Sequence, residues 1–219
     1  MRQRIYIETT VWYQMVNYAE SEFKEMSRRL FGLIEKARYE TFISTVVLEE
    51  ITLNSSKYRK RLELLIDTYK PVVLVPNAEA EDIAAAYVEN AFRGRVRSEV
   101  LADAFHAAIA TVANISYIAS YNYRNLLSVR VLENFNAVNL LAGYNHFLSI
   151  IPPFMFLDLV DYNGEKGAVD DRVWMIKRDV GEKFEKLYRV PLSKRMRHYG
   201  DVAKRAQKKF GVQILAIGE

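Results

Sequence analysis

The sequence has no cysteine among its 219 residues. This absence excludes a disulfide scaffold and any zinc or iron–sulfur site with cysteine ligands, and it agrees with a reducing compartment. No apolar run reaches the roughly 20 residues that a membrane-spanning helix needs. The N-terminal stretch MRQRIYIE lacks the apolar core of a signal peptide. We therefore expect a cytoplasmic protein with no membrane partner.

Motifs for nucleotide binding and for histidine-based metal sites are missing as well. The chain has neither a glycine-rich phosphate loop nor a dinucleotide-binding fingerprint. Its three histidines, His106, His146 and His198, are too scattered to predict a histidine-based metal site. Hydrophobic residues, by contrast, make up 50% of the chain, which is enough for one core plus an appendage.

Charge is distributed unevenly along the chain. Residues 159–219 carry 14 Lys and Arg against 9 Asp and Glu, whereas residues 1–158 carry 17 against 18. A near-neutral body is thus followed by a basic tail. This asymmetry is typical of a chain with a polyanionic partner, or of a tail that docks on an acidic surface. A solvated helical face is the plain alternative.

Strand-like and helical segments alternate over the body. Short apolar segments predict five strands, at residues 4–8, 40–44, 70–76, 115–120 and 147–153. Amphipathic or alanine-rich segments between them predict helices, and Thr9 is expected to cap the first of these. The alternation indicates βαβ units and a parallel sheet, which holds its sites at the carboxyl ends of the strands.

Acidic residues stand where these elements would bring them together. Glu8 ends the first strand, Glu50 lies on the helix after the second, and Asp103 lies on the helix that leads into the fourth. Buried carboxylates repel one another unless a cation joins them, and Mg²⁺ prefers such oxygen ligands. That cation would activate a water and clamp a phosphate. Each acid, taken alone, also has an ordinary explanation as a helix cap or a surface charge.

Four stretches carry a more specific signal: IYIETTVW, ISTVVLEEI, LADAFHAAIATVANISYIASYNYRNL and IIPP. In this order and spacing, over residues 1–158, they resemble PIN-domain proteins of the VapC-type toxin ribonuclease group. The resemblance implies a PIN-like three-layer α/β/α sandwich with a central parallel sheet. It also implies Mg²⁺ or Mn²⁺ held by a cluster of acids, and cleavage of single-stranded RNA.

Carried over residue by residue, the resemblance assigns catalytic roles. It makes Glu8, Glu50 and Asp103 the metal ligands, and Asn122 the residue that orients a ligand or water. Most members have Asp where this chain has Glu8, but a branch that reads YIETT carries Glu there. Many members have a fourth acid three residues beyond the Asn, where this chain has Asn125. Because an amide supplies no charge, the resemblance implies weak or absent activity.

Polar residues around the predicted site are candidate substrate ligands: Thr10, Asn125, Arg93, Arg95 and Arg97. The arginines fall in FRGRVRSE, a predicted loop, from which they would guide an RNA backbone unless they are simply solvated. The threonine hydroxyl would bind a phosphate or a metal-bound water, with capping of the first helix as an equal alternative. His106, one turn after Asp103, is expected to pack and hydrogen-bond behind the site rather than to relay a proton.

Residues 159–219 are predicted to form a basic helical extension. Gly164 and Gly167 mark a linker, after which residues 171–188 form a helix with one apolar stripe: Val173, Ile176, Val180, Phe184 and Leu187. We expect this stripe to pack on the body of its own chain or of a dimer mate. The basic segment beyond Pro191 should then lie near the acidic site. There it either extends an RNA track or acts as a built-in inhibitor.

The sequence therefore predicts a metal-dependent endoribonuclease, a hydrolase of the toxin–antitoxin kind that uses metal-activated water and no nucleophilic side chain. Its expected partners are RNA and either an antitoxin or an intramolecular antitoxin-like tail, and its expected assembly is a homodimer. The alternative is a catalytically silent PIN scaffold that binds RNA or a protein through its basic tail. A different acid-cluster phosphohydrolase is disfavoured because no Asp-x-Asp motif follows the first strand.

Overall fold

A six-stranded parallel sheet organises the protein. The computed structural model describes residues 2–157 and 171–217, except for the side chains of residues 171–176. The strands are β1 (Gln3–Ile7), β2 (Tyr39–Ser44), β3 (Val72–Val75), β4 (Tyr117–Ala119), β5 (Ser149–Ile151) and β6 (Ile214–Ala216). They lie in the order β5-β4-β1-β2-β3-β6, and every pairing is parallel. The predicted α/β fold with a central parallel sheet is confirmed.

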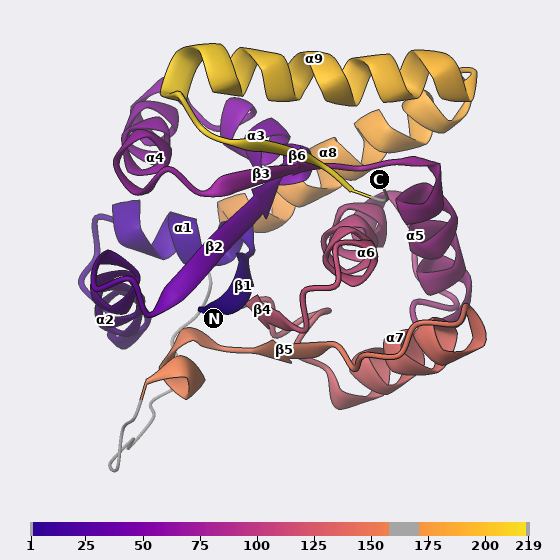
Figure 1. The fold of residues 1–219 in the computed structure, drawn as a ribbon, viewed down its shortest axis with the longest axis horizontal. Helices are drawn as coiled ribbons and strands as arrows, with labels where there is room; N and C mark the ends of the chain where they lie inside the picture. The colour runs from indigo at the N-terminus through magenta and orange to yellow at the C-terminus, as the bar shows by residue number, and fades with distance from the viewer. Residues whose placement is uncertain (1, 158–170, 218–219) are drawn as a thin grey trace.

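Helices cover both faces of this sheet. They are α1 (Thr9–Val16), α2 (Glu22–Glu35), α3 (Thr45–Thr52), α4 (Ser56–Tyr69), α5 (Ala78–Asn90), α6 (Arg97–Val112) and α7 (Val129–Leu141), followed by the short 3-10 helix η1 (Pro153–Phe156). Helices α1, α2 and α4 lie on one side and α5, α6 and α7 on the other (Figure 1), which is compatible with three layers. Within the described ranges, no helix is long and apolar enough to cross a membrane.

The strands are apolar because both of their faces are covered. In β1, Ile5, Tyr6 and Ile7 have no exposed surface, so the strand reads as a continuous apolar run rather than as an alternation. Trp12 of α1 donates a hydrogen bond from Nε1 to the carbonyl oxygen of Ile7, at 3.2 Å. Its ring meets Phe31 of α2 at 4.8 Å between centroids. The end of β1 is thereby held firmly against the first two helices.

The chain reverses its course across the sheet beside β1. It moves outward from β1 to β2 and β3, then crosses to β4 on the other side of β1. In sheets wound this way, ligands bind outside the carboxyl ends of the strands at the point of reversal. Ile7 pairs with Ala119 at that point, and Glu8 and Ser120 are the next residues along each strand. The fold therefore places Glu8 where a binding site is expected.

The C-terminal extension departs from the prediction at its end. It forms α8 (Asp171–Tyr188) and α9 (Leu192–Phe210), but it finishes in β6, which pairs with the edge of β3. The predicted helical character of the extension holds for α8 and α9, whereas β6 was not predicted. Gly211 ends α9 in a left-handed conformation, with φ of 62°, and the apolar residues after it cover an otherwise open sheet edge. The predicted boundary at residues 158 and 159, and both linker glycines, lie outside the described residues.

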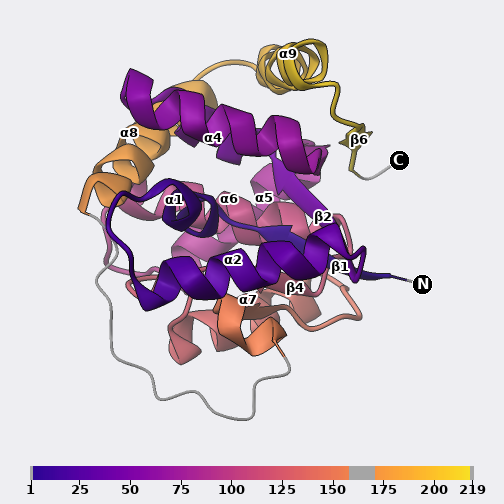
Figure 2. The same cartoon turned by 90° about the vertical axis from the view of Figure 1, so that its left-hand side faces the viewer.

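Helix α8 packs tightly on α6. Val180 and Phe184 have no exposed surface, which confirms the predicted stripe at these positions, and the side chains of Val173 and Ile176 lie outside the described part. Phe184 meets Phe105 of α6 at 4.8 Å between ring centroids. A Cβ added to Gly181 would lie 1.8 Å from the carbonyl oxygen of Ser98, so only glycine permits this approach. Figure 2 shows the N-terminal end of β1 on one side of the molecule and α8 on the other.

This packing predicts that the extension is part of the folded body. Phe184→Ala should lower the free energy of unfolding by about 3–5 kcal/mol, because it empties a closed aromatic cluster. Phe147→Ala is the matched control, since Phe147 is 72% exposed and its loss should cost less than about 0.5 kcal/mol. Urea unfolding of both variants measures the difference. Equal stabilities would show that α8 does not belong to the core.

Candidate functional site

Three carboxylates from separate segments converge at the carboxyl edge of the sheet. Glu8 directly follows β1, and Glu50 lies on α3, the helix after β2. Asp103 lies in the first half of α6; because this helix leads back to the start of β4, its first half is at the strand-end edge. None of the three has exposed surface. The sequence placed these acids at one site, and the structure brings them there.

The centre of this group is a lysine. Lys177 of α8 is 2% exposed, and its Nζ lies 2.5 Å from Oε1 of Glu8. The same Nζ lies 3.0 Å from Oδ1 of Asp103 and 3.3 Å from Oε1 of Glu50. Each carboxylate therefore turns one oxygen toward a single buried cation. The cluster as described is an ion-pair network of three acids and one ammonium.

The second oxygen of each carboxylate is held by the protein. Oε2 of Glu8 accepts hydrogen bonds from the backbone N–H of Thr10, at 3.1 Å, from the Thr10 hydroxyl, and from Ser120 Oγ at 3.0 Å. Oε2 of Glu50 accepts from the hydroxyl of Thr9. Oδ2 of Asp103 accepts from Nδ2 of Asn125 at 2.6 Å. These bonds fix the carboxylates so that the remaining three oxygens point inward.

Glu8, rather than Thr9, caps the first helix. Its side chain accepts from the N–H of Thr10, which satisfies one of the free donors at the start of α1. The predicted cap, Thr9, instead sends its hydroxyl to Glu50. A carboxylate is also favoured at this end of a helix by the helix dipole. Glu8 thus both caps α1 and belongs to the acid cluster.

His106 lies behind the acids and joins them to the core. Its Nδ1 lies 2.7 Å from the Tyr6 hydroxyl, and its Nε2 lies 3.2 Å from Oε2 of Glu50. Burial raises the pKa of Tyr6 well above its usual value, and the Tyr6 hydroxyl also lies 2.6 Å from Oγ of Ser44. This bears out the expectation that His106 packs and hydrogen-bonds behind the site.

The same geometry places one histidine among the possible metal ligands. Ligand atoms of Glu8, Glu50 and His106 lie within 4.8 Å of one another, which is close enough to share a metal ion. The histidines are scattered along the sequence, but α6 carries His106 one turn beyond Asp103 and so into the same site. A histidine can therefore belong to the group after all.

The charges of the cluster are strongly coupled. Burial by itself would raise the pKa of Glu50, but the positive charge of Lys177, together with His106, lowers it to about 2. Burial would lower the pKa of Lys177, but Asp103, Glu50 and Glu8 raise it well above its usual value. The ammonium is therefore charged. Three formal negative charges face one positive charge, so the neutralisation is incomplete.

The two asparagines after β4 make different contacts beside the acids. Asn125, predicted to contact substrate, is the one that bonds Asp103. Asn122, predicted to orient a ligand, accepts a hydrogen bond at its Oδ1 from the backbone N–H of Asn125, at 3.0 Å. Its Nδ2 is buried and has no hydrogen-bond partner in the described part of the chain.

The other predicted substrate ligands are dispersed. Thr10 is buried with its hydroxyl engaged by Glu8 and by the backbone N–H of Tyr121, at 2.8 Å. Arg95 donates to Oδ1 of Asn125, and thus stands two contacts from Asp103. Arg97 places its guanidinium 5.2 Å from the ring of Tyr188 on α8, and Arg93 is exposed. Of the three arginines, Arg95 lies nearest to the acids through these contacts.

Lys177 was not predicted as part of the site. A basic group from beyond Pro191 was expected near the acids, whereas the buried ammonium comes from α8, fourteen residues earlier. A signal was present, because Lys177 follows Ile176 and precedes Val180 by three positions, which puts it on the apolar stripe. A lysine within an apolar stripe either reaches solvent or finds buried carboxylates.

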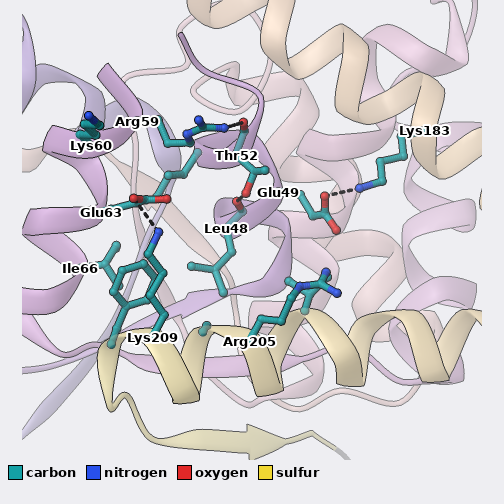
Figure 3. A pocket seen from close by; sticks show the side chains of 14 residues that line it. Leu48, Glu49, Thr52, Arg59, Lys60, Glu63, Ile66, Lys183, Arg205 and Lys209 are labelled. Carbon is teal, nitrogen blue, oxygen red and sulfur yellow. Dashed lines mark hydrogen bonds and ion pairs between the residues drawn. The ribbon is translucent and has the colours of Figure 1, made fainter. Parts of the chain in front are cut away.

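A basic cleft of about 480 Å³ opens on the far flank of α3 (Figure 3). Its floor is apolar, and its charged lining residues are Arg59, Lys60, Lys183, Arg205, Lys209, Glu49 and Glu63. Lys183 pairs with Glu49, and Lys209 pairs with Glu63 at 2.6 Å. In the described part of the chain no carboxylate pairs with Arg59, Lys60 or Arg205. Glu49 thus faces this cleft, while its neighbour Glu50 faces the acid cluster.

Comparisons with known proteins assign this chain to no family. No family model matches the chain, and neither a curated protein nor a solved structure does. The resemblance to PIN domains therefore remains a prediction from the sequence.

The buried network predicts a strong dependence of stability on Lys177. In metal-free buffer, Lys177→Met should lower the free energy of unfolding by about 3–5 kcal/mol, because it leaves buried carboxylates without a counterion. Lys183→Met is the control; its side chain is 39% exposed and its pair with Glu49 should contribute less than about 1 kcal/mol. Urea titration in the presence of a chelator measures both. A Lys177→Met protein as stable as the control would mean that Lys177 is not held in the cluster.

Proposed function

We propose that this chain is a metal-dependent endoribonuclease with a PIN-like fold. The observation that supports it most is the convergence of Glu8, Glu50 and Asp103, each with one oxygen directed at a single cation position. This position lies at the reversal point of a parallel sheet, where such folds bind their ligands. Apolar residues at these three positions would pack at least as well as buried acids do, so packing alone does not explain the acids.

The donor set fits a hard divalent cation. Mg²⁺ and Mn²⁺ favour carboxylate oxygens, and three inward-facing oxygens with further positions left for water suit either ion. Glu8, Glu50 and Asp103 would hold the metal; the ligand atoms of Glu8 and Glu50 lie within 4.8 Å of one another and of His106, and Asp103 faces the same position through Lys177. A bound divalent ion supplies an activated water and neutralises charge on a phosphodiester. The fit requires that the Lys177 ammonium leave, because it lies among the same oxygens.

The protein's own residues prepare this centre. Thr10 and Ser120 fix one oxygen of Glu8, and Asn125 fixes one oxygen of Asp103, so the ligands are oriented before any cation binds. His106 does the same for Glu50. The free amide of Asn122 is a donor for a substrate oxygen or a water. No side chain is required as a nucleophile.

RNA is the proposed substrate because the chain offers cations on two sides of the acids. Arg95, in the loop before α6, donates to Asn125, which in turn bonds Asp103. The cleft beside α3 presents Arg59, Lys60 and Arg205 without carboxylate partners in the described part of the chain. Phosphate contacts by such residues dominate nucleic-acid affinity. The basic tail then contributes an RNA track through α9, which carries Arg205.

The runner-up is a catalytically silent scaffold that binds RNA or a protein partner. One observation favours it: Lys177 neutralises part of the cluster and closes it without any metal. In that case the lysine is a permanent substitute for the cation. The two functions differ in a measurable property, because a silent scaffold binds no divalent metal at these acids even when Lys177 is removed.

Cleavage of single-stranded RNA tests the proposal. In the full chain with Lys177→Met, Mn²⁺ should support cleavage, and adding Asp103→Asn should reduce the rate by at least about 100-fold, since it removes a charged ligand. Asp179→Asn, at an exposed aspartate of α8, is the matched control and should leave the rate unchanged. A Lys177→Met protein that neither binds Mn²⁺ nor cleaves RNA would favour the silent scaffold.

The RNA track makes a separate prediction. Arg205→Gln should weaken binding of single-stranded RNA and reduce the slope of log Kd against log salt by about 1, because one phosphate contact is lost. Lys208→Gln, on the same helix but outside the cleft, should change neither. Fluorescence anisotropy at several salt concentrations measures both quantities. Identical slopes for the two variants would remove the cleft from the RNA path.

A further inference from the structure

We infer that α8 is an inhibitory arm built into the chain, and that the Lys177 ammonium takes the position of the divalent cation. The inference rests on the proposed metal site and states how that site is regulated. Docking of α8 and binding of a divalent metal exclude each other. The described form of the protein is the closed, inhibited form, and the metal binds only after α8 leaves the cluster.

The exclusion follows from the positions of the oxygens. Nζ of Lys177 lies 2.5–3.3 Å from one oxygen of each of Glu8, Asp103 and Glu50. Mg²⁺ lies about 2.1 Å from its oxygen ligands, so a metal held by these atoms would occupy the place of the ammonium. Two cations at such a separation repel strongly in a buried site. The cluster therefore accepts one of them at a time.

Burial extends the exclusion to the substrate. Glu8, Glu50 and Asp103 have no exposed surface, and Lys177 is 2% exposed. A hydrated metal and a phosphodiester both need an open path to these carboxylates. Lys177 comes from α8, so undocking of this helix removes the ammonium and uncovers the acids in a single movement.

Incomplete neutralisation makes the arm displaceable. One ammonium faces three carboxylates. A divalent ion would compensate one more negative charge than Lys177 does. A ligand shifts a conformational equilibrium by the difference in its affinity for the two states. A metal that binds only the undocked form therefore draws α8 away from the body.

Gly181 gives a way to undock α8 without touching the cluster. Its Cα faces the backbone of Ser98 so closely that an added Cβ would lie 1.8 Å from the carbonyl oxygen. Gly181→Ala therefore forces α8 away from α6 while Lys177 and all the acids remain. Gly200, in α9, has no atom within 4 Å of an added Cβ, and Gly200→Ala is the matched control.

Calorimetric titration with Mn²⁺ tests the inference directly. Compared with the wild-type chain, Lys177→Met and Gly181→Ala should bind Mn²⁺ about 5- to 150-fold more tightly, the usual range for coupled equilibria. Gly200→Ala should bind as the wild type does. Wild-type affinity equal to that of both variants would overturn the inference, and so would failure of both variants to bind Mn²⁺.

Hydrogen exchange on the wild-type chain tests it without any substitution. Saturating Mn²⁺ should speed exchange of the α8 backbone amides and leave those of α2, on the opposite flank, unchanged. Mn²⁺ binding with α8 as protected as before would overturn the inference. Tight Mn²⁺ binding by Lys177→Met without RNA cleavage would reject the ribonuclease and leave the inhibitory arm standing, so the two failures are distinguishable.

Discussion

The contact between the Lys177 ammonium and three buried carboxylates governs this structure. A single ammonium brought among Glu8, Glu50 and Asp103 must be charged, because the acids around it raise its pKa well above its usual value. Breaking such a network is costly, since whichever partner remains is a buried charge without compensation. The position of α8, the closure of the site and the burial of the acids all depend on this contact. The extension is therefore bound to the body by the ion pairs of Lys177 as well as by its apolar stripe.

The same contact is compatible with both proposed functions, the metal-dependent ribonuclease and the silent scaffold. Replacing buried ion pairs by apolar residues of the same volume is often neutral or stabilising, so stability alone does not account for three acids and one lysine here. Oriented oxygens, fixed by Thr10, Ser120 and Asn125, account for a site prepared for a cation. Lys177 then either replaces the metal permanently, as in the silent scaffold, or occupies the metal position until a metal displaces it. The excess of negative charge in the cluster favours the second, because a site built for a single ammonium would need fewer acids.

Much of the fold was predictable because its signals are local. The five strands expected in the body all form, since each is a short apolar segment between helical ones, and they pair in parallel as βαβ units require. The exceptions are set by distant contacts. Thr9 has the right residue type for a cap, yet the carboxylate of Glu8 takes that role and Thr9 bonds Glu50, 41 residues away. Strand β6 exists because β3 has a free edge, which three residues near the C-terminus do not reveal.

The sequence by itself determined that Glu8, Glu50 and Asp103 meet, because the carboxyl ends of parallel strands lie at one edge of the sheet. Glu8 follows β1 directly, and the other two lie on the helices that follow β2 and precede β4. It also determined that an apolar stripe with a basic far side must pack on something. Only the tertiary structure decided what fills the acidic centre. Which of the chain's many basic residues enters it depends on the depth and angle at which α8 docks, and these are set by the close approach of Gly181 to Ser98. That approach joins positions 83 residues apart, and no local pattern in the sequence encodes it.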